Sequence, residues 1–598
     1  MLKKFFLNVL SSFVGAWIAF GVCVLGLVLT VVALVGSVGS IGSASTGQLK
    51  KNSLMQIDLK GAIEETERPT GPDYMGLLNG DIEMPQALDQ LVAAIREAKN
   101  EKNIKGIYLE CGGVSASPAT LNALRNELLS FKKSGKPIYA YGDALSMGDY
   151  FVATVADSIF LNPEGSLDLS GVSGSSLYLK DFFDKIGVQF EVVKVGTFKS
   201  AVEPYISNEM SAPARAQLDT LYSVIWDRIR GDIAKSRKVN SAQIDTLINR
   251  DFLSLQTAAF VKKHKLVDRC VYTREVDGIL ARLAGVDVDD LNIVEPGLLA
   301  EKSDWGKGNS SDEQIAVLYA TGEIAEGSSN GIDCETLVPV ITDLADDDNV
   351  KGMVLRVNSP GGSVFGSAQI GEALDYFQSK GKPLAVSMGD YAASGGYWIS
   401  CCADRIFADP LTITGSIGIF GLIPNAAGLA SKLGVSPQFV STNPEADFPT
   451  LLKPMTPAQH AAMQKNVERG YDQFVSRVAK GRKMKKEKVL AIAEGRVWSA
   501  ITAQKIGLVD QLGSLQDAIE YVAKQAKIQK DYEVGVYPQL DPDFWTLMAQ
   551  SSELASGSSR LFQKITESAP NYIVEYYAKK TFLRKPVQAR MQDIQVKL

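Results

Sequence analysis

Histidine is scarce in this chain of 598 residues, which contains only two. His264 stands in the basic run 262–265, and His460 falls early in a helix that we expect to begin after Pro457. Neither context suggests the buried setting of a general base, which argues against a Ser-His-Asp triad. If a serine acts as a nucleophile here, a side chain other than histidine must take its proton.

The cysteines also lack any spacing typical of a metal site. They stand at positions 23, 111, 270, 334, 401 and 402, so we expect neither a zinc site nor a disulfide framework. Long basic runs are missing too, and the formal net charge is −6, which argues against nucleic acid as a partner. What is present is the composition of globular protein, 45% hydrophobic and 22% charged. The length predicts about three or four units.

A long uncharged stretch occupies the N-terminus. No charged residue stands between Lys4 and Lys50, and residues 13–38 are almost entirely apolar. About 25 such residues, at about 1.5 Å each, span the roughly 30 Å hydrocarbon core of a bilayer, whereas a cleaved signal has an apolar region of only about 7–15 residues. We therefore expect one uncleaved transmembrane helix within residues 1–48. Lys3 and Lys4 predict a cytoplasmic N-terminus, with the rest of the chain on the outer face of the membrane.

After this anchor the chain repeats itself. The segment 103–109 returns as 349–355, and the Gly-Lys-Pro turn 135–137 returns as 381–383, both at an offset of 246. Two copies of one domain are the simplest account of this similarity. The predicted bounds are 49–295 for the first copy, 296–313 for a linker rich in Pro, Gly, Ser and Asn, 314–540 for the second copy, and 541–598 for a helical tail.

Each copy alternates short apolar strands with Gly/Pro turns and amphipathic helices. In the second copy we expect strands at 350–357 and 384–388, and helices at 367–380 and 395–402. Strands that alternate with helices form parallel sheets through right-handed crossovers. The predicted fold class is therefore α/β.

Ser394 is the candidate nucleophile, in the segment Ala-Ala-Ser-Gly-Gly at 392–396. A serine flanked by small residues and followed by glycines can expose its hydroxyl at the start of a helix, beside a backbone amide that can bind an oxyanion. The alternative is a simple helix N-cap. The first copy has Met147 at the aligned position, so it lacks a nucleophile there.

Lys199 is the candidate base, in the segment 195–205 of the first copy. A lysine accepts a proton only when neutral, which requires burial to lower its pKa from about 10.4 toward roughly 7–8. Phe198, Ala201, Val202 and Tyr205 are candidates for such apolar surroundings. The alternative is an ordinary surface lysine. The alignment places Lys199 near Ala446 in the second copy, so each copy lacks what the other has.

Four segments of the sequence form motifs typical of a known protein family: 358–363, 392–398, 414–418 and 196–204. They resemble those of the signal peptide peptidase A (protease IV) family, in its long form with an N-terminal anchor and two repeats. The resemblance covers about residues 1–540. It implies a tandem fold similar to crotonase and the Clp protease, and a serine/lysine pair in which Ser394 is the nucleophile and Lys199 the base.

The same resemblance implies further roles. The backbone amides of Gly362 and Gly395 would form the oxyanion hole, and Ser416 would orient the lysine. The expected activity is a serine endopeptidase without metal or cofactor, acting on apolar peptides such as signal peptides left after preprotein processing. The expected assembly is a homotetramer in the bacterial inner membrane, held by the N-terminal helix, with a cytoplasmic N-terminus and periplasmic catalytic domains.

Two other functions remain open from the sequence. A crotonase-like acyl-CoA enzyme would share the fold and a glycine-rich oxyanion hole, but it needs a carboxylate base and a CoA-binding surface. A catalytically inactive, membrane-anchored scaffold is the non-enzyme alternative, and it predicts that Ser394 is inert to serine-directed reagents.

Overall fold

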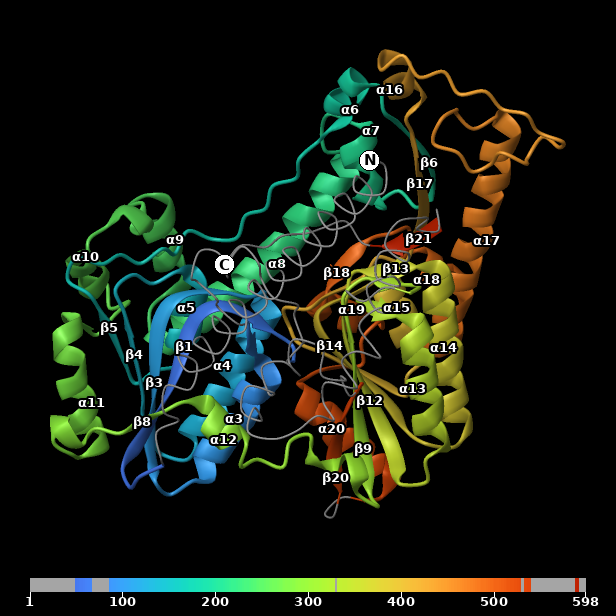
Figure 1. The fold of residues 1–598 in the computed structure, drawn as a ribbon. Coiled ribbons are helices and arrows are strands. Elements are labelled where there is room, and N and C mark those ends of the chain that lie inside the picture. Colours follow the sequence, from blue (N-terminus) through green and yellow to red (C-terminus); the bar gives the residue numbers. More distant parts are fainter. Residues whose placement is uncertain (1–48, 67–84, 328–330, 529–531, 539–586, 591–598) are drawn as a thin grey trace, which may run out of the picture. The chain divides into compact units, whose positions relative to one another are not determined.

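The computed structural model describes residues 49–66, 85–327, 331–528, 532–538 and 587–590, all of which belong to one unit of the chain (Figure 1). The predicted anchor, residues 1–48, lies outside the described residues. Within the described part of the chain, no helix is both long enough and apolar enough to cross a membrane.

The first copy is built around a parallel sheet with the strand order β2-β1-β3-β4-β5-β7, and β8 pairs with β1. Its strands are β1 (Ser53–Glu64), β2 (Gln86–Ala87), β3 (Ile104–Ser115), β4 (Ile138–Gly142), β5 (Ser158–Leu161), β7 (Arg269–Cys270) and β8 (Ile293–Val294). The core of this copy combines apolar side chains of these strands with those of several helices, among them α3 (Leu88–Asn100), α4 (Pro118–Lys132), α5 (Met147–Ala153) and α8 (Ala212–Arg237). Shorter helices follow at α6 (Lys180–Ile186), α7 (Glu203–Ile206), α9 (Ser241–Asn249), α10 (Ala258–Lys263), α11 (Val276–Ala284) and α12 (Pro296–Ala300).

The second copy has a mostly parallel sheet with the strand order β18-β16-β14-β12-β9-β20, in which only the edge strand β18 is antiparallel to its neighbour β16, and β15 and β19 are joined beside β14. Its strands are β9 (Gln314–Thr321), β12 (Val350–Ser359), β14 (Leu384–Ala393), β15 (Arg405–Ala408), β16 (Ile413–Gly415), β18 (Val497–Ser499), β19 (Gln511–Leu512) and β20 (Glu533–Tyr537). Its helices are α13 (Cys334–Asp346), α14 (Val364–Ser379), α15 (Gly395–Ser400), α16 (Ala427–Lys432), α17 (Pro457–Gly481), α18 (Lys486–Leu490), α19 (Ala500–Ile506) and α20 (Leu515–Ala526). The predicted α/β fold class is confirmed.

Strand β9, between β12 and β20, shows why this sheet needs helices on both faces. Successive side chains of a strand point to opposite faces. Accordingly, Ala316 and Leu318 of β9 join the core formed with α13 and α14, whereas Ile315 and Val317 pack with α20. Figure 1 shows α13 and α14 covering one side of the sheet and α20 at the other. Burial on both faces explains the nearly continuous apolar run of this strand.

The two sheets share a register, but they differ beside Ser394. Ile107 pairs with Ile138 in the first sheet, and Met353 pairs with Leu384 at the corresponding place in the second. Strand β4 ends after five residues, whereas β14 runs for ten. The strand predicted at 384–388 therefore continues to Ala393, directly before Ser394.

A third, smaller sheet combines both copies, in the order β11-β10-β13-β21-β17-β6. Its strands are β6 (Gln189–Val195), β10 (Ile324–Ala325), β11 (Ile332–Asp333), β13 (Gly361–Ser363), β17 (Ile419–Asn425) and β21 (Val587–Arg590). Strand β6 comes from the first copy and pairs antiparallel with β17 along its whole length. Lys199, four residues after β6, is thereby brought to the second copy.

Strand β21 lies within the tail 541–598, for which we expect helices. The structure describes only Val587–Arg590 of this tail, and these four residues form a strand. This strand lies between β13 and β17 and is antiparallel to both. A segment of only four residues has little strand signal of its own, so its conformation follows from pairing with chain that is distant in sequence.

The two copies also share apolar packing. The core of the first copy includes Ala393, Leu411, Ile413 and Val497, all from the second copy. Ala393 is the residue before Ser394, so the end of β14 is packed by both copies.

Candidate active site

Ser394 occupies a sharp turn between β14 and α15. Its φ of 56° and ψ of −115° are unusual for a residue with a side chain. The turn is held by main-chain bonds, because Ser394 N donates to Gly415 O at 2.8 Å and Trp398 N donates to Ser394 O at 2.9 Å. The serine side chain makes no capping bond to α15. The N-cap alternative therefore does not describe this residue.

Lys199 meets Ser394 inside the protein. Its Nζ lies 2.8 Å from Ser394 Oγ, and it also contacts Ser416 Oγ at 3.1 Å and Ser416 O at 3.3 Å. Only 1% of Lys199 and none of Ser394 is exposed. The structure thus brings together three predicted site residues from two copies, and the surface-lysine alternative is wrong.

Gly495, Gly418 and Phe420, which the sequence did not assign to the surroundings of Lys199, lie close to it. A Cβ at Gly495 would lie 2.7 Å from Lys199 Cβ, and one at Gly418 would lie 3.3 Å from Lys199 Cδ. Glycine at these positions therefore leaves room for the lysine stem. The Phe420 ring centroid is 5.9 Å from Nζ. Gly418 belongs to the motif 414–418, and this motif was the one sequence signal that could have indicated its place beside Lys199.

Burial lowers the pKa of Lys199 well below its usual value. The polar contacts of its amine are serine oxygens, which stabilise the ammonium less than a carboxylate would. Glu203, which follows in the same segment, instead accepts bonds from Ser211 N at 3.1 Å and Ser211 Oγ at 2.7 Å. This environment favours the neutral amine, which is the form that a general base needs.

Ser416 lies in a second strained turn, directly after β16. Its φ is 52°, and its backbone N donates to Arg496 O at 2.7 Å. Ser394 Oγ is 3.4 Å from Gly418 O in the same turn. The segment 415–418 thus lies against both members of the Lys199–Ser394 pair.

Gly362 and Gly395, the predicted oxyanion-hole residues, lie on β13 and at the start of α15. A Cβ at Gly362 would lie 2.1 Å from Ile324 O, so the tight packing of β13 on β10 requires glycine. A Cβ at Gly396 would lie 2.7 Å from Ser359 O, which shows how closely α15 approaches the turn before β13. The structure therefore places the glycine turn 358–363 next to the helix that begins after Ser394.

The chain matches the profile of peptidase family S49 at residues 130–287 and 376–529, one stretch in each copy. "Protease 4" of Salmonella typhi is 35% identical over 507 residues, which are 81% of this chain and 80% of that protein.

This chain belongs to peptidase family S49.

It is therefore a serine protease. A shorter relative, the "Putative signal peptide peptidase SppA" of Enterococcus faecium, is 35% identical over 225 residues, 37% of this chain and 65% of the relative. Among solved structures, ClpP1 from Listeria monocytogenes aligns with a TM-score of 0.23 and 16% identity, covering 34% of this chain and 92% of that one.

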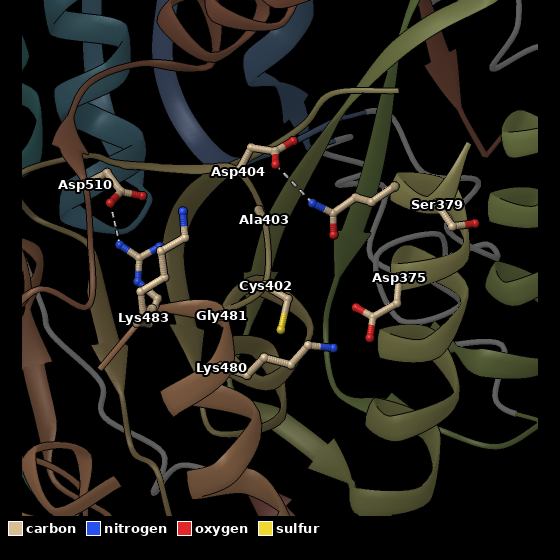
Figure 2. Close-up of a pocket in the computed structure, with 11 residues that line it drawn as sticks. Asp375, Ser379, Cys402, Ala403, Asp404, Lys480, Gly481, Lys483 and Asp510 are labelled. Atoms are coloured by element: carbon tan, nitrogen blue, oxygen red, sulfur yellow. Dashed lines mark hydrogen bonds and ion pairs between the residues drawn. The ribbon is translucent and has the colours of Figure 1, made fainter. Parts of the chain in front are cut away.

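The S49 peptidase also has a cavity away from the Lys199–Ser394 pair (Figure 2). It encloses about 540 Å³ and is lined by Cys402, Asp375, Asp404, Lys480 and neighbouring residues. The Sγ atoms of Cys401 and Cys402 are 3.9 Å apart, and neither residue is in a disulfide. The described residues contain no cluster of His, Cys, Asp and Glu suited to a metal ion. The lining includes neither member of the pair, so the candidate active site lies elsewhere.

Proposed function

We propose that this S49 peptidase is a membrane-anchored endopeptidase that uses Ser394 and Lys199 as a catalytic dyad on apolar peptides, with leftover signal peptides as its substrates. The observation that carries the proposal is the 2.8 Å contact between the buried Lys199 amine and the Ser394 hydroxyl. Among the described residues Lys199 has no carboxylate partner, so its burial adds little to stability, because burying an ammonium costs free energy. A role as the general base would account for the burial of this lysine.

The first half of the reaction forms an acyl-enzyme. Neutral Lys199 takes the proton of Ser394 Oγ as this oxygen attacks the peptide carbonyl. Ser416 keeps the amine aimed at the serine through its Oγ contact. The backbone amides of Gly362 and Gly395 would stabilise the oxyanion. Lys199 then gives its proton to the leaving amine, and the peptide bond breaks.

The second half restores the enzyme. A water molecule takes the place of the leaving amine and gives a proton to Lys199 as its oxygen attacks the ester carbon. Collapse of the second oxyanion returns the proton to Ser394 and releases the carboxylic acid product. The Ser394 hydroxyl and the Lys199 amine therefore carry out the nucleophilic attack and the proton transfers of both halves of the reaction.

The place of strand β21 supports binding of an extended peptide. β21 lies antiparallel to β13 and β17, with Gly362 opposite Ala589 and Phe420 opposite Gln588. The space between β13 and β17 therefore accepts one strand of main chain beside the dyad. A peptide substrate that takes this place would bind mainly through its backbone. This mode suits an enzyme that must degrade many different apolar sequences.

The remaining parts of the proposal concern location and assembly. The apolar N-terminal segment would hold the enzyme where signal peptides are released, in the bacterial inner membrane with periplasmic catalytic domains. The printed name of the Enterococcus faecium relative supports this substrate class. We further propose two crotonase-like domains, 49–295 and 314–540, in a homotetramer that needs no cofactor.

Hydrolysis of a short apolar peptide ester by the full-length protein in detergent tests the dyad. Both Ser394→Ala and Lys199→Ala should lose at least about 10³-fold in kcat/KM, and the wild-type rate should rise with pH as Lys199 becomes neutral. A fluorophosphonate should label wild type and not Ser394→Ala. Full activity of Ser394→Ala would exclude this mechanism, and activity of Lys199→Ala alone would assign the base to another residue.

A further inference from the structure

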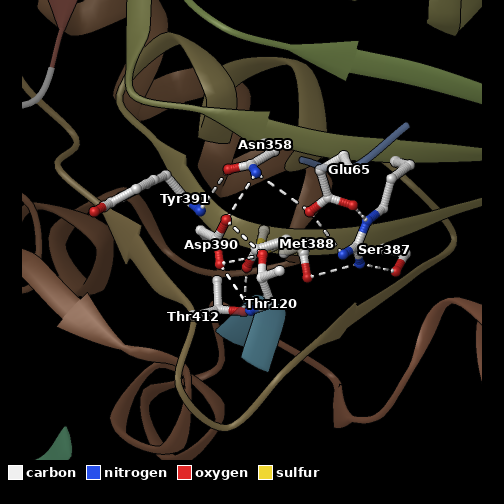
Figure 3. A network of polar contacts seen from close by, with 10 residues as sticks. Glu65, Thr120, Asn358, Ser387, Met388, Asp390, Tyr391 and Thr412 are labelled. Atoms are coloured by element: carbon white, nitrogen blue, oxygen red, sulfur yellow. Dashed lines mark hydrogen bonds and ion pairs between the residues drawn. The ribbon is translucent and has the colours of Figure 1, made fainter. Parts of the chain in front are cut away.

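A buried polar cluster lies at the carboxyl ends of β12 and β14, next to the dyad but outside it (Figure 3). Its ionisable side chains are Glu65, Arg356 and Asp390, of which 5%, 7% and 9% are exposed. Burying such groups is costly unless each is paired and hydrogen-bonded. Glu65 comes from the first copy, whereas Arg356 and Asp390 come from the second.

Asp390 joins the nucleophile strand to a helix of the first copy. Its carboxylate accepts bonds from Thr120 N at 2.9 Å and from Thr120 Oγ1 at 3.0 and 2.9 Å. Thr120 lies in the first turn of α4, where Ser117, the N-cap, makes no side-chain capping bond. Asp390 therefore caps this helix from 270 residues away, and its negative charge suits a helix N-terminus.

Asn358 joins the nucleophile strand to the strand that leads to the glycine turn. Its Nδ2 donates to Asp390 Oδ2 at 3.0 Å and to Glu65 Oε1 at 3.2 Å, while its Oδ1 accepts from Tyr391 N at 3.1 Å. Both ends of the amide are thus used, so its orientation is fixed. Glu65 is held in turn by a bidentate pair with Arg356, with both N–O distances 2.9 Å.

These contacts surround an irregularity in the sheet. Val357 pairs with Met388, but Ser359 pairs with Ala392, so β14 carries two more residues than β12 across this interval. The interval contains Asp390. It is followed within a few residues by Gly362 on one strand and Ser394 on the other. The bulge therefore determines how far the nucleophile stands from the glycine turn.

We propose that Asp390 and Asn358 are positioning residues that set the spacing between Ser394 and the backbone amides that bind the oxyanion, and that the first copy holds this spacing through Thr120 and Glu65. The inference rests on the proposed dyad. The first copy then has two tasks, since it provides the base and also keeps the nucleophile in register.

The charge of Asp390 matters for this role. Burial, reinforced by the neighbouring Glu65, raises the pKa of Asp390 to about 6. Above that pH its carboxylate accepts from Thr120 and Asn358 at the same time. An amide at this position has only one oxygen, and its NH2 group would face the donors of Asn358 or Thr120. Asp390→Asn therefore disturbs the bulge with almost no change in size.

The test compares this variant with a matched one, in full-length protein at pH 8. Asp409→Asn is the control, because Asp409 also contacts α4 of the first copy, accepting from Asn122 Nδ2 at 2.7 Å, and its other bond is to the nearby Leu411 N. We expect Asp390→Asn to lose at least tenfold in kcat/KM for the peptide ester, while Asp409→Asn stays within about threefold of wild type.

A second readout separates positioning from general destabilisation. A peptide aldehyde forms a covalent adduct with the serine and places an oxyanion in the hole, as the transition state does. Its inhibition constant should rise in parallel with the loss in kcat/KM in Asp390→Asn. Binding of a non-reactive peptide of the same sequence should stay within about twofold.

A substitution in the first copy keeps the inference testable if Asp390→Asn does not fold. Thr120→Val removes the hydroxyl and should lose activity and aldehyde affinity together, whereas Thr120→Ser keeps the hydroxyl and should restore both. The inference is wrong if Asp390→Asn and Thr120→Val keep wild-type kcat/KM, or if Asp409→Asn loses as much as Asp390→Asn. Failure of the dyad itself would look different, because Ser394→Ala would then remain active.

Discussion

At the scale of single residues, three residues of the candidate site adopt a conformation or an environment that is costly. Ser394 and Ser416 both adopt positive φ, and Lys199 is buried with serine oxygens as its polar contacts. Each of these features costs stability. The hydroxyls of Ser394 and Ser416 both lie within 3.1 Å of the Lys199 amine, and this arrangement is the basis of the chemistry proposed for this site.

Replacing Lys199 should stabilise the protein in a pH-dependent way. Because the folded-state pKa is lowered, the unfolded chain binds more protons between that pKa and about 10.5, so stability rises with pH across this window. Lys199→Met, made in the inactive Ser394→Ala background, should therefore raise the Tm most at low pH and progressively less toward pH 10. Thermal unfolding between pH 6 and 10 measures this. The exposed Lys102 gives the control, since Lys102→Met should show no such trend, and a pH-independent gain at Lys199 would contradict the assignment.

Ser416→Ala should weaken the dyad without abolishing it. The variant loses the Oγ contact at 3.1 Å but keeps the carbonyl contact at 3.3 Å. One hydrogen bond contributes about 1 kcal/mol, which predicts roughly a fivefold fall in kcat/KM. The pH–rate profile should keep its shape. A loss of 10³-fold would instead place Ser416 on the path of the proton.

At the scale of secondary-structure elements, Gly362 allows β13 to pack tightly against β10 beside the candidate oxyanion hole. Gly362→Ala would put a Cβ 2.1 Å from Ile324 O, so β13 must move away from β10. Losing one oxyanion donor costs about 10²–10³ in kcat, and we expect a loss in this range. Gly231→Ala on α8 is the control, because its added Cβ meets nothing within 4 Å. Near-normal activity of Gly362→Ala would remove this residue from the oxyanion hole.

The elements also show where sequence reasoning succeeds and stops. Apolar runs bounded by Gly and Pro predicted β12 and α14 within a few residues. Strand β14 is longer than the predicted strand 384–388. The prediction stopped there because Gly389, Asp390 and Tyr391 break the apolar pattern, although in the structure they form a bulge within the strand. The motifs predicted Lys199 and Ser394 as candidate site residues. The glycines around the lysine stem and the contact of Thr120 with Asp390, however, depend on tertiary packing between residues far apart in the chain. No local pattern contains that information.

At the scale of the whole molecule, the described part of the two copies behaves as one body. The first-copy core includes second-copy residues, and β6 pairs with β17. A protease site inserted after the exposed Lys302, between α12 and β9, should therefore be cleavable without loss of function. The two fragments should co-elute in gel filtration and keep kcat/KM within about twofold. Separation of the fragments under native conditions would contradict this packing.

The distance of 2.8 Å between Lys199 and Ser394 within a single chain also has a genetic consequence. A cell that makes both a Ser394→Ala chain and a Lys199→Met chain has every functional group of the site, but never in one polypeptide. The two alleles should therefore fail to complement each other, and their mixture should hydrolyse no more peptide ester than either chain alone. Each copy contributes one member of the Lys199–Ser394 pair, so loss of either residue should inactivate the whole chain.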